Sequence, residues 1–237
     1  MADEQRTARE IVQEHLQRGD GVGWFEPFYA LAEGNPARIP WAASGPRRDL
    51  VQWARESHAA GNGQSALVIG CGLGDDAEFL AELGYRVTAF DISATAIDWC
   101  KERFPETAVD YQVADMFAPP PVWLGGFDLV VEDYIVQALP LEMRQASVQA
   151  VAAFPAPGGL LLAIGRGIED GAERSGPPWP LTGAELALFV KAGLLRVSFH
   201  RDSDAAIAPQ FRYRAEFRRG AKQGPAQALA QIDGIGE

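Results

Sequence analysis

Short apolar segments alternate with segments of helical periodicity through the middle of the chain. The apolar residues 66–69 run into a glycine-rich turn, an amphipathic segment follows, and a second apolar run begins at residue 86. Strands this apolar are typical of a parallel sheet that helices cover on both faces. The expected strands are 66–69, 86–90, 109–113, 127–131 and 160–164, and the expected helices between them are 76–83, 94–103 and 141–154.

The pattern changes toward the C-terminus. Thr182 and Glu185 have the spacing of a capping box, which predicts the start of a helix after a long loop over 165–180. Beyond that helix, apolar and polar residues alternate over 195–199 and 211–217, as in strands with one solvated face. We expect these two segments to form an antiparallel hairpin that closes the sheet.

The N-terminal part carries helical patterns around an aromatic segment. Residues 5–18 and 47–59 each place apolar side chains at helical spacing. Residues 23–45 combine five aromatic side chains with three prolines and show no clear period, which indicates a loop. This loop either folds over a binding site or packs as a surface flap on its own domain.

These patterns predict an α/β fold with a single-domain, doubly wound (Rossmann-like) sheet. The sheet is expected to be mostly parallel with a C-terminal antiparallel hairpin, and to carry an N-terminal helical and aromatic lid. A chain of 237 residues is long enough for one such domain with a full core. We expect N-terminal helices and lid over 1–60, a cofactor-binding core over 64–219 and a loose tail over 220–237.

Composition and charge narrow the function classes. The hydrophobic fraction of 47% and charged fraction of 22% are those of an ordinary soluble globule. The net charge of −11 argues against nucleic acid as a partner, because phosphate attraction needs positive charge. A chain without a long apolar run or an apolar N-terminus predicts no membrane partner and a cytoplasmic location. Two cysteines, Cys71 and Cys100, lack the spacing of a metal site, so we expect no metal.

A glycine turn and two acids suggest a nucleoside site. Glycines at 70, 72 and 74 follow the first strand, and the second strand ends on Asp91, roughly 20 residues later. At that distance a carboxylate can accept hydrogen bonds from ribose hydroxyls. Asp115 follows the third strand, where it can accept a hydrogen bond from an adenine amino group.

The residues after the glycines separate two cofactor classes. A dinucleotide would place its pyrophosphate at the N-terminus of the following helix. That helix begins with Asp75 and Asp76, whose carboxylates would repel a pyrophosphate. S-adenosylmethionine contains adenosine without phosphate and carries a sulfonium and an ammonium group. We therefore expect S-adenosylmethionine as the cofactor, with S-adenosylhomocysteine as its product, and keep a nicotinamide oxidoreductase as the lesser alternative.

Five short segments carry a family resemblance. The first strand and turn read ALVIGCGLGDD, with Val68 where most methyltransferases have an acid, and residues 90–93 read FDIS. Residues 133–134 read DY, 176–179 read GPPW and 40–41 read PW. On these residues the chain, over roughly 20–218, resembles the class I S-adenosylmethionine-dependent methyltransferases. Within them it resembles the branch that contains thiopurine methyltransferase and the plant halide/thiol methyltransferases.

The resemblance implies direct methyl transfer to a small-molecule acceptor, most simply a soft nucleophile such as a thiol or halide. Thiopurine enzymes have an arginine where Tyr134 stands, which argues against a thiopurine-like acceptor. O- or N-methylation of a larger natural product and a cofactor-binding module without catalysis stay open as alternatives. We expect a monomer or a weak homodimer.

The expected site residues fall into three groups. Asp133 and Tyr134, after the fourth strand, are expected to orient or deprotonate the acceptor. The expected cofactor-binding residues are Trp41, Gly70, Cys71, Gly72, Gly74, Asp91, Ile92, Asp115, Met116 and Glu132. The expected walls of the acceptor pocket are Trp24, Phe28, Tyr29, Trp41, Tyr134 and Trp179.

Overall fold

A computed structural model describes residues 8–42, 45–203 and 207–221 of the chain. The parts of the expected helix before residue 8 and of the expected tail after residue 221 lie outside the described residues. None of the helices in the described ranges has the length and apolar character needed to cross a bilayer. The α-helices are α1 Ala8–Gln17, α2 Phe25–Leu31, α3 Arg48–Glu56, α4 Asp75–Glu82, α5 Ala94–Arg103, α6 Ile135–Ala138, α7 Arg144–Ala152 and α8 Gly183–Lys191, and the 3₁₀ helices are η1 Pro36–Arg38, η2 Pro121–Trp123 and η3 Leu141–Met143.

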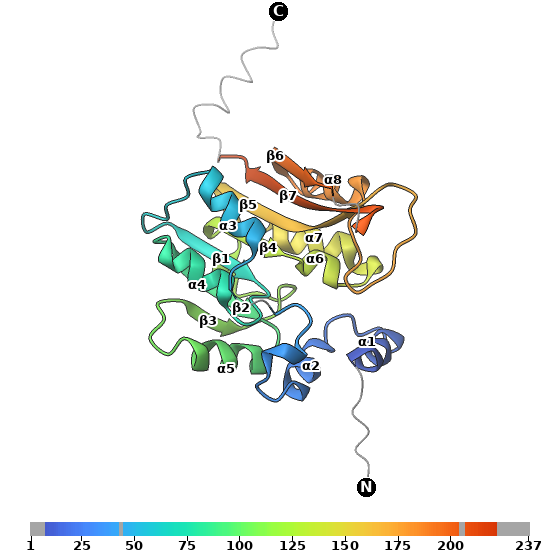
Figure 1. Cartoon of the computed structure of the whole chain (residues 1–237). Coiled ribbons are helices and arrows are strands. Elements are labelled where there is room, and N and C mark those ends of the chain that lie inside the picture. Colours follow the sequence, from blue (N-terminus) through green and yellow to red (C-terminus); the bar gives the residue numbers. More distant parts are fainter. Residues whose placement is uncertain (1–7, 43–44, 204–206, 222–237) are drawn as a thin grey trace, which may run out of the picture.

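The described residues contain a seven-stranded sheet with the order β3-β2-β1-β4-β5-β7-β6 (Figure 1). The first five strands of this order pair in parallel, and β7 pairs antiparallel with both β5 and β6. The expected doubly wound sheet with a C-terminal antiparallel hairpin is therefore confirmed. The strands are β1 Ser65–Ile69, β2 Arg86–Asp91, β3 Asp110–Val113, β4 Phe127–Asp133, β5 Pro155–Ile168, β6 Leu194–Asp202 and β7 Gln210–Arg219.

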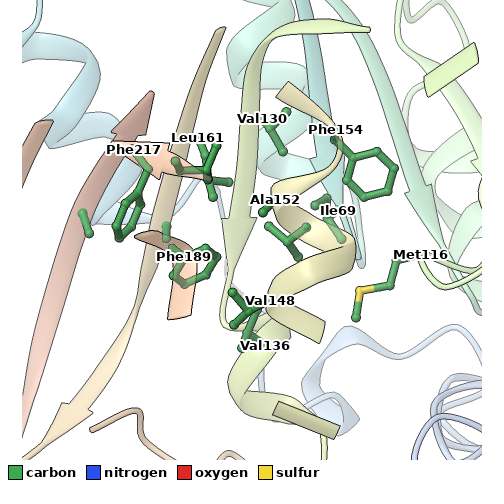
Figure 2. Close-up of a cluster of buried hydrophobic side chains, with 14 of the residues drawn as sticks. Ile69, Met116, Val130, Val136, Val148, Ala152, Phe154, Leu161, Phe189 and Phe217 are labelled. Carbon is green, nitrogen blue, oxygen red and sulfur yellow. The ribbon is translucent and has the colours of Figure 1, made fainter. Parts of the chain in front are cut away.

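Alternate side chains of the central strands enter two separate cores. In β1, Leu67 and Ile69 pack with α7 and α8, whereas Ala66 and Val68 pack with α3, α4 and α5. Figure 2 shows the first core, in which Val148 of α7 lies among strand residues and the aromatic side chains of α8 and β7. Because both faces of β1 are covered, its residues can all be apolar. This explains the continuous apolar run in the sequence.

The expected element bounds hold to within a few residues, with three differences. The aromatic segment contains α2, so the prediction of a loop over 23–45 was wrong there. Strand β5 is longer than the expected 160–164, because its C-terminal part pairs with β7 through Ile168. A short helix, α6, follows β4 and was not expected. The capping box of α8 is confirmed, since the hydroxyl of Thr182 accepts from the Glu185 N–H and the Glu185 carboxylate accepts from the Thr182 N–H.

The N-terminal helices are held beside the glycine turn. Trp24, Phe28 and Tyr29 are buried in a third core that includes Leu73 and Ala96. The carboxylate of Glu26 in α2 accepts hydrogen bonds from the Ser93 and Thr95 hydroxyls, at 2.6 and 2.7 Å, at the start of α5. The expected aromatic lid is thus fixed by packing and by these hydrogen bonds over the end of β1.

Candidate active site

A cavity of about 860 Å³ opens at the carboxyl ends of β1 and β4, where the winding of the sheet reverses. Ligands of open α/β sheets bind at this switch point, and ligand pockets span roughly 300–1,000 Å³. The walls come from the N-terminal aromatic segment, the glycine turn, the end of β4, strand β5 and residues 175–178. Residues from widely separated parts of the chain therefore meet at one site.

The glycine turn after β1 requires residues without a side chain. Gly70 and Gly74 have positive φ angles of 59° and 89°, which L side chains rarely adopt. A Cβ at Gly70 would lie 2.3 Å from Ile135 Cδ1, and one at Gly74 would lie 2.5 Å from the Tyr111 hydroxyl. Gly70, Cys71 and Gly72 line the cavity, whereas Gly74 is the N-cap of α4 behind it. The turn therefore brings bare backbone to the cavity wall.

The carboxylate of Asp91 joins the glycine turn to the end of β2. One oxygen accepts from the Gly72 N–H at 3.0 Å, and the other accepts from the Ser93 N–H at 2.9 Å. The residue is 6% exposed, and burial raises its pKa to about 6 although these backbone donors lower it. A buried carboxylate that faces a cavity and has remaining lone pairs is suited to accept hydroxyl hydrogen bonds.

A second cavity of about 60 Å³ adjoins the first and shares Gly70, Asp91 and Ile135 with it. Its wall includes the expected residues Ile92, Asp115 and Met116. Asp115 already accepts a hydrogen bond from the Phe117 N–H at 2.8 Å through Oδ1. Asp91 therefore borders both spaces, as a residue that binds a ribose between a base and a further chain would.

Aromatic side chains cover the other side of the large cavity. The rings of Trp24 and Phe25 stack with centroids 3.8 Å apart, and the ring of Phe28 lies 4.7 Å from that of Trp41. The Trp41 indole N–H donates to the Tyr29 hydroxyl at 2.7 Å. All five residues line the cavity, and the contribution of Trp24, Phe28, Tyr29 and Trp41 to an acceptor pocket stays a prediction.

A polar cluster lies at the end of β4. Arg47 Nε lies 3.1 Å from Asp133 Oδ2, and the Arg47 backbone N–H donates to Asp76 Oδ1 at 2.7 Å. The Arg47 guanidinium also lies over the Tyr134 ring, 5.0 Å from its centroid. Tyr134 has a φ of 65°, a conformation that costs a non-glycine residue energy and is often found at functional sites. Asp133 and Tyr134 both line the cavity, together with Arg166.

The acids behind the glycine turn are not free charges. Asp75 forms a bidentate ion pair with Arg103, with distances of 2.8 and 2.9 Å. Asp76 is held by the Arg47 backbone N–H. The expectation that both carboxylates repel a pyrophosphate was therefore too simple for Asp75, whose charge is neutralised by a neighbour that sequence spacing did not reveal.

Glu132 and Trp179, like Gly74, line neither cavity. Glu132 is 1% exposed, and its Oε2 accepts from the Ile135 and Val136 N–H groups at 3.1 and 3.2 Å. Burial raises the pKa of Glu132 to about 7. Trp179 donates its backbone N–H to the Gln137 carbonyl at 2.7 Å, and its ring packs against Gly176. These contacts support α6 and the loop before α8, and the expected contacts of the two residues with cofactor and acceptor stay predictions.

Three polar residues of the cavity are not among the site residues expected from the sequence. Arg47 comes from the segment before α3, and Arg166 and Gln210 come from the paired ends of β5 and β7. Arg166 Nε and Gln210 Oε1 are buried and have no hydrogen-bond partner among the described residues. The sequence predicts a loop at Arg166, where the structure has the C-terminal part of β5. For β7, the strand that pairs with this part, the signal in the sequence is the alternation of apolar and polar residues over 211–217.

The donor and acceptor groups of the two cavities fit S-adenosylmethionine. Asp91 offers lone pairs beside the smaller cavity, and the glycine turn leaves room for close approach of a ligand to the backbone. The described residues contain no cluster of three His, Cys, Asp or Glu side chains able to hold a metal ion. The fit of S-adenosylmethionine to the two cavities is argued from their hydrogen-bonding groups and their shape.

The sequence is similar to those of several methyltransferases. A family model described as thiopurine S-methyltransferase matches residues 34–219. A 2-heptyl-1-hydroxyquinolin-4(1H)-one methyltransferase of Mycobacteroides abscessus is 28% identical over 127 residues, which cover 52% of this chain and 53% of that protein. The matched part thus spans about half the length of that relative.

Two further comparisons cover more of the chain. A probable thiol methyltransferase 2 of Arabidopsis thaliana is 25% identical over 210 residues, which cover 86% of this chain and 87% of that protein. The N-methyltransferase NodS from Bradyrhizobium japonicum, solved with S-adenosyl-L-homocysteine, has a TM-score of 0.61 and 21% identity, with coverage of 81% of this chain and 98% of that one. At this identity the solved structure supports the fold alone.

Proposed function

Because the chain belongs to the thiopurine S-methyltransferase family, we propose that it transfers a methyl group from S-adenosylmethionine to a small-molecule acceptor and releases S-adenosylhomocysteine. One observation carries this proposal most directly. The buried Asp91 carboxylate is tied to the glycine turn and faces both cavities at the switch point of the sheet. This is the arrangement that binds the ribose of a nucleoside cofactor.

When bound, S-adenosylmethionine supplies a methyl group on a positively charged sulfur. Asp91 would accept hydrogen bonds from the ribose hydroxyls, and the glycine turn 70–74 would let the cofactor approach the backbone closely. Asp115 would accept from the adenine amino group, and Ile92 and Met116 would pack against the ring. Trp41, which donates to the Tyr29 hydroxyl, closes the cavity beside the turn.

A soft nucleophile is the acceptor that we propose first. The relative named as a thiol methyltransferase aligns over most of both chains. The aromatic wall of Trp24, Phe25, Phe28 and Trp41 excludes water, and a soft nucleophile reacts well when it is aligned and dry. Asp133 and Tyr134 would orient the acceptor from the opposite wall.

The polar end of the cavity favours a second candidate, an acceptor with a hydroxyl group. Asp133 Oδ1, Arg166 Nε and Gln210 Oε1 are buried in residues that line the cavity, and they have no hydrogen-bond partner in the described part of the chain. Unpaired buried polar groups are costly, and an acceptor with its own donors and acceptors would satisfy them. The relative named for a hydroxyquinolone has an acceptor of this kind.

A turnover panel tests the proposal. The purified protein is incubated with S-adenosylmethionine and, separately, an aromatic thiol, iodide or a phenol, and S-adenosylhomocysteine and the methylated acceptor are quantified by mass spectrometry. We expect equal amounts of both products, with the highest rate for the thiol. A higher rate for the phenol supports the second candidate. If no acceptor raises S-adenosylhomocysteine above the acceptor-free level, the proposed function is wrong.

A further inference from the structure

Two carboxyl groups meet at the polar end of the cavity. Asp76 belongs to the first turn of α4 and Asp133 ends β4, and Arg47 contacts both carboxylates: its backbone N–H donates to Asp76 Oδ1 at 2.7 Å, and its Nε lies 3.1 Å from Asp133 Oδ2. Both residues line the cavity. Two ionised carboxylates held on one arginine repel each other, and a single proton on the pair removes this repulsion.

From this geometry we infer that Asp76 and Asp133 share one proton and that the pair takes up the proton which a protic acceptor loses when it is methylated. The inference about proton uptake rests on the proposed function, whereas the shared proton does not. Arg47 holds the pair in place, because its Nε contacts Asp133 Oδ2 and its backbone N–H contacts Asp76 Oδ1. The other oxygen of Asp133 is buried and receives no hydrogen bond from an N–H or O–H group of the described residues.

The surroundings favour one negative charge on the pair. Burial raises the pKa of Asp133 well above its usual value, and the nearby Asp76 raises it further while Arg47 opposes the rise. Burial also raises the pKa of Asp76, which the Arg47 N–H and guanidinium oppose. Like charges this close do not both ionise readily, as in carboxylate dyads that carry a single proton. The titratable or charged groups that face the pair are Arg47, Asp75, Glu132, Tyr134 and Tyr213.

The proton transfer balances in atoms and charge. The bond between the acceptor atom and its hydrogen breaks, and the proton goes to the ionised carboxylate of the pair. The electron pair left on the acceptor atom forms the new bond to the methyl carbon as the carbon–sulfur bond of the donor breaks. The pair changes from one negative charge to none while the sulfonium charge disappears, so the total charge at the site is unchanged. Solvent later takes the proton from the pair.

The arrangement also points to the class of acceptor. A halide has no proton to lose and gains nothing from the pair. A thiol or hydroxyl acceptor needs a base unless it is already ionised, and a positioned base contributes about 10²–10⁴-fold to the rate. The pair therefore suits acceptors that are protonated at neutral pH.

Infrared spectroscopy of the cofactor-free protein tests the shared proton independently of activity. The protein is labelled with ¹³C at its aspartate carboxyl groups, so that Glu132, whose pKa is raised to about 7, does not contribute. At about pH 8, above the pKa of about 6 of Asp91, we expect a protonated aspartate band that disappears in Asp133→Asn and in Asp76→Asn. Asp98→Asn, an exposed change on α5, should keep the band. Absence of the band in the wild type would overturn the inference.

Paired acceptors test the proton transfer. We expect Asp133→Asn and Asp76→Asn to lower the rate with a thiol of high pKa by about 10²-fold near neutral pH. At higher pH, where the thiol ionises without a base, the rates of both variants should approach the wild-type rate. The loss of rate with iodide should be smaller and should not depend on pH, because no proton is transferred.

The outcomes separate the alternatives. An equal loss with both acceptors at every pH would assign the pair a structural role in holding Arg47 and would overturn the proton transfer. Asparagine can donate the hydrogen bond that the shared proton makes, so both variants should fold, and circular dichroism checks this. A wild-type protein that methylates no acceptor overturns the proposed function together with proton uptake, while the infrared band still decides whether the proton is shared.

Discussion

The buried carboxylate of Asp91 should make the stability of the cofactor-free protein depend on pH. Burial raises its pKa from the usual 3.8 to about 6. Because the folded-state pKa lies above the unfolded-state value, its contribution to stability is fully present below pH 3.8 and is lost as the pH rises through about 6. The variant Asp91→Asn cannot ionise, so its free energy of unfolding should lack this pH-dependent part.

The size of the effect follows from the shift. A rise from 3.8 to about 6 corresponds to about 3 kcal/mol in total, of which about 1.4 kcal/mol is lost between about pH 5 and pH 8. The asparagine also turns its amide NH₂ toward the backbone N–H of either Gly72 or Ser93, and that N–H group then has no acceptor. This costs about 1–3 kcal/mol at every pH. The deficit of the variant relative to the wild type should therefore shrink by about 1.4 kcal/mol toward pH 8.

Urea unfolding, followed by tryptophan fluorescence at several pH values over this range, measures the difference. Glu132 also titrates there, with a pKa of about 7, but it does so in both proteins and cancels. The exposed variant Asp98→Asn should run parallel to the wild type. A constant gap between wild type and Asp91→Asn across the range would refute a raised pKa at Asp91.

Two further changes test the packing of α4 and α8. A Cβ at Gly74 would lie 2.5 Å from the Tyr111 hydroxyl, whereas one at Gly84, with a similar φ of 86°, would have no neighbour closer than 3.6 Å. Gly74→Ala should therefore lose about 2–5 kcal/mol of unfolding free energy and Gly84→Ala only about 1–2 kcal/mol, and equal losses in urea unfolding would contradict the contact. Thr182→Ala removes the hydroxyl that accepts from the Glu185 N–H and should cost about 1 kcal/mol, while Thr182→Ser should keep most of it. Thermal unfolding compares Thr182→Ala with Thr182→Ser, and equal midpoints would contradict a stabilising hydrogen bond from the Glu185 N–H to the Thr182 hydroxyl.

The core of the fold was predictable because its signals are local. Residues 66–103 form two strands and two helices within about two residues of the expected bounds, since glycines and charged residues mark their ends. Asp91 could be placed because a strand end and a fixed spacing decide its position. The apolar run of β1 could be interpreted as a strand buried on both faces. This interpretation does not require knowing which residues cover the strand.

The remaining features depend on contacts between distant parts of the chain. Helix α2 forms where Trp24, Phe28 and Tyr29 pack against Leu73 and Ala96, and this tertiary burial outweighs the absence of a helical period.

The polar end of the cavity also depends on contacts between distant parts of the chain. Arg47, Asp76 and Asp133 come from three elements, and sequence spacing does not reveal that they meet. Glu132 lies one residue before Asp133 along β4, so its side chain points to the other face of the sheet, toward the backbone donors of α6.

Calorimetry with S-adenosylhomocysteine tests the central claim, a nucleoside site built on Asp91 and the glycine turn, most directly. The wild type should bind the ligand with measurable heat, and Asp91→Ala should bind about 100-fold more weakly or not at all, because hydrogen bonds to a charged group contribute about 1.5–3 kcal/mol each. Asp98→Asn should bind like the wild type. Absence of binding by the wild type, or equal affinity in Asp91→Ala, would contradict the account.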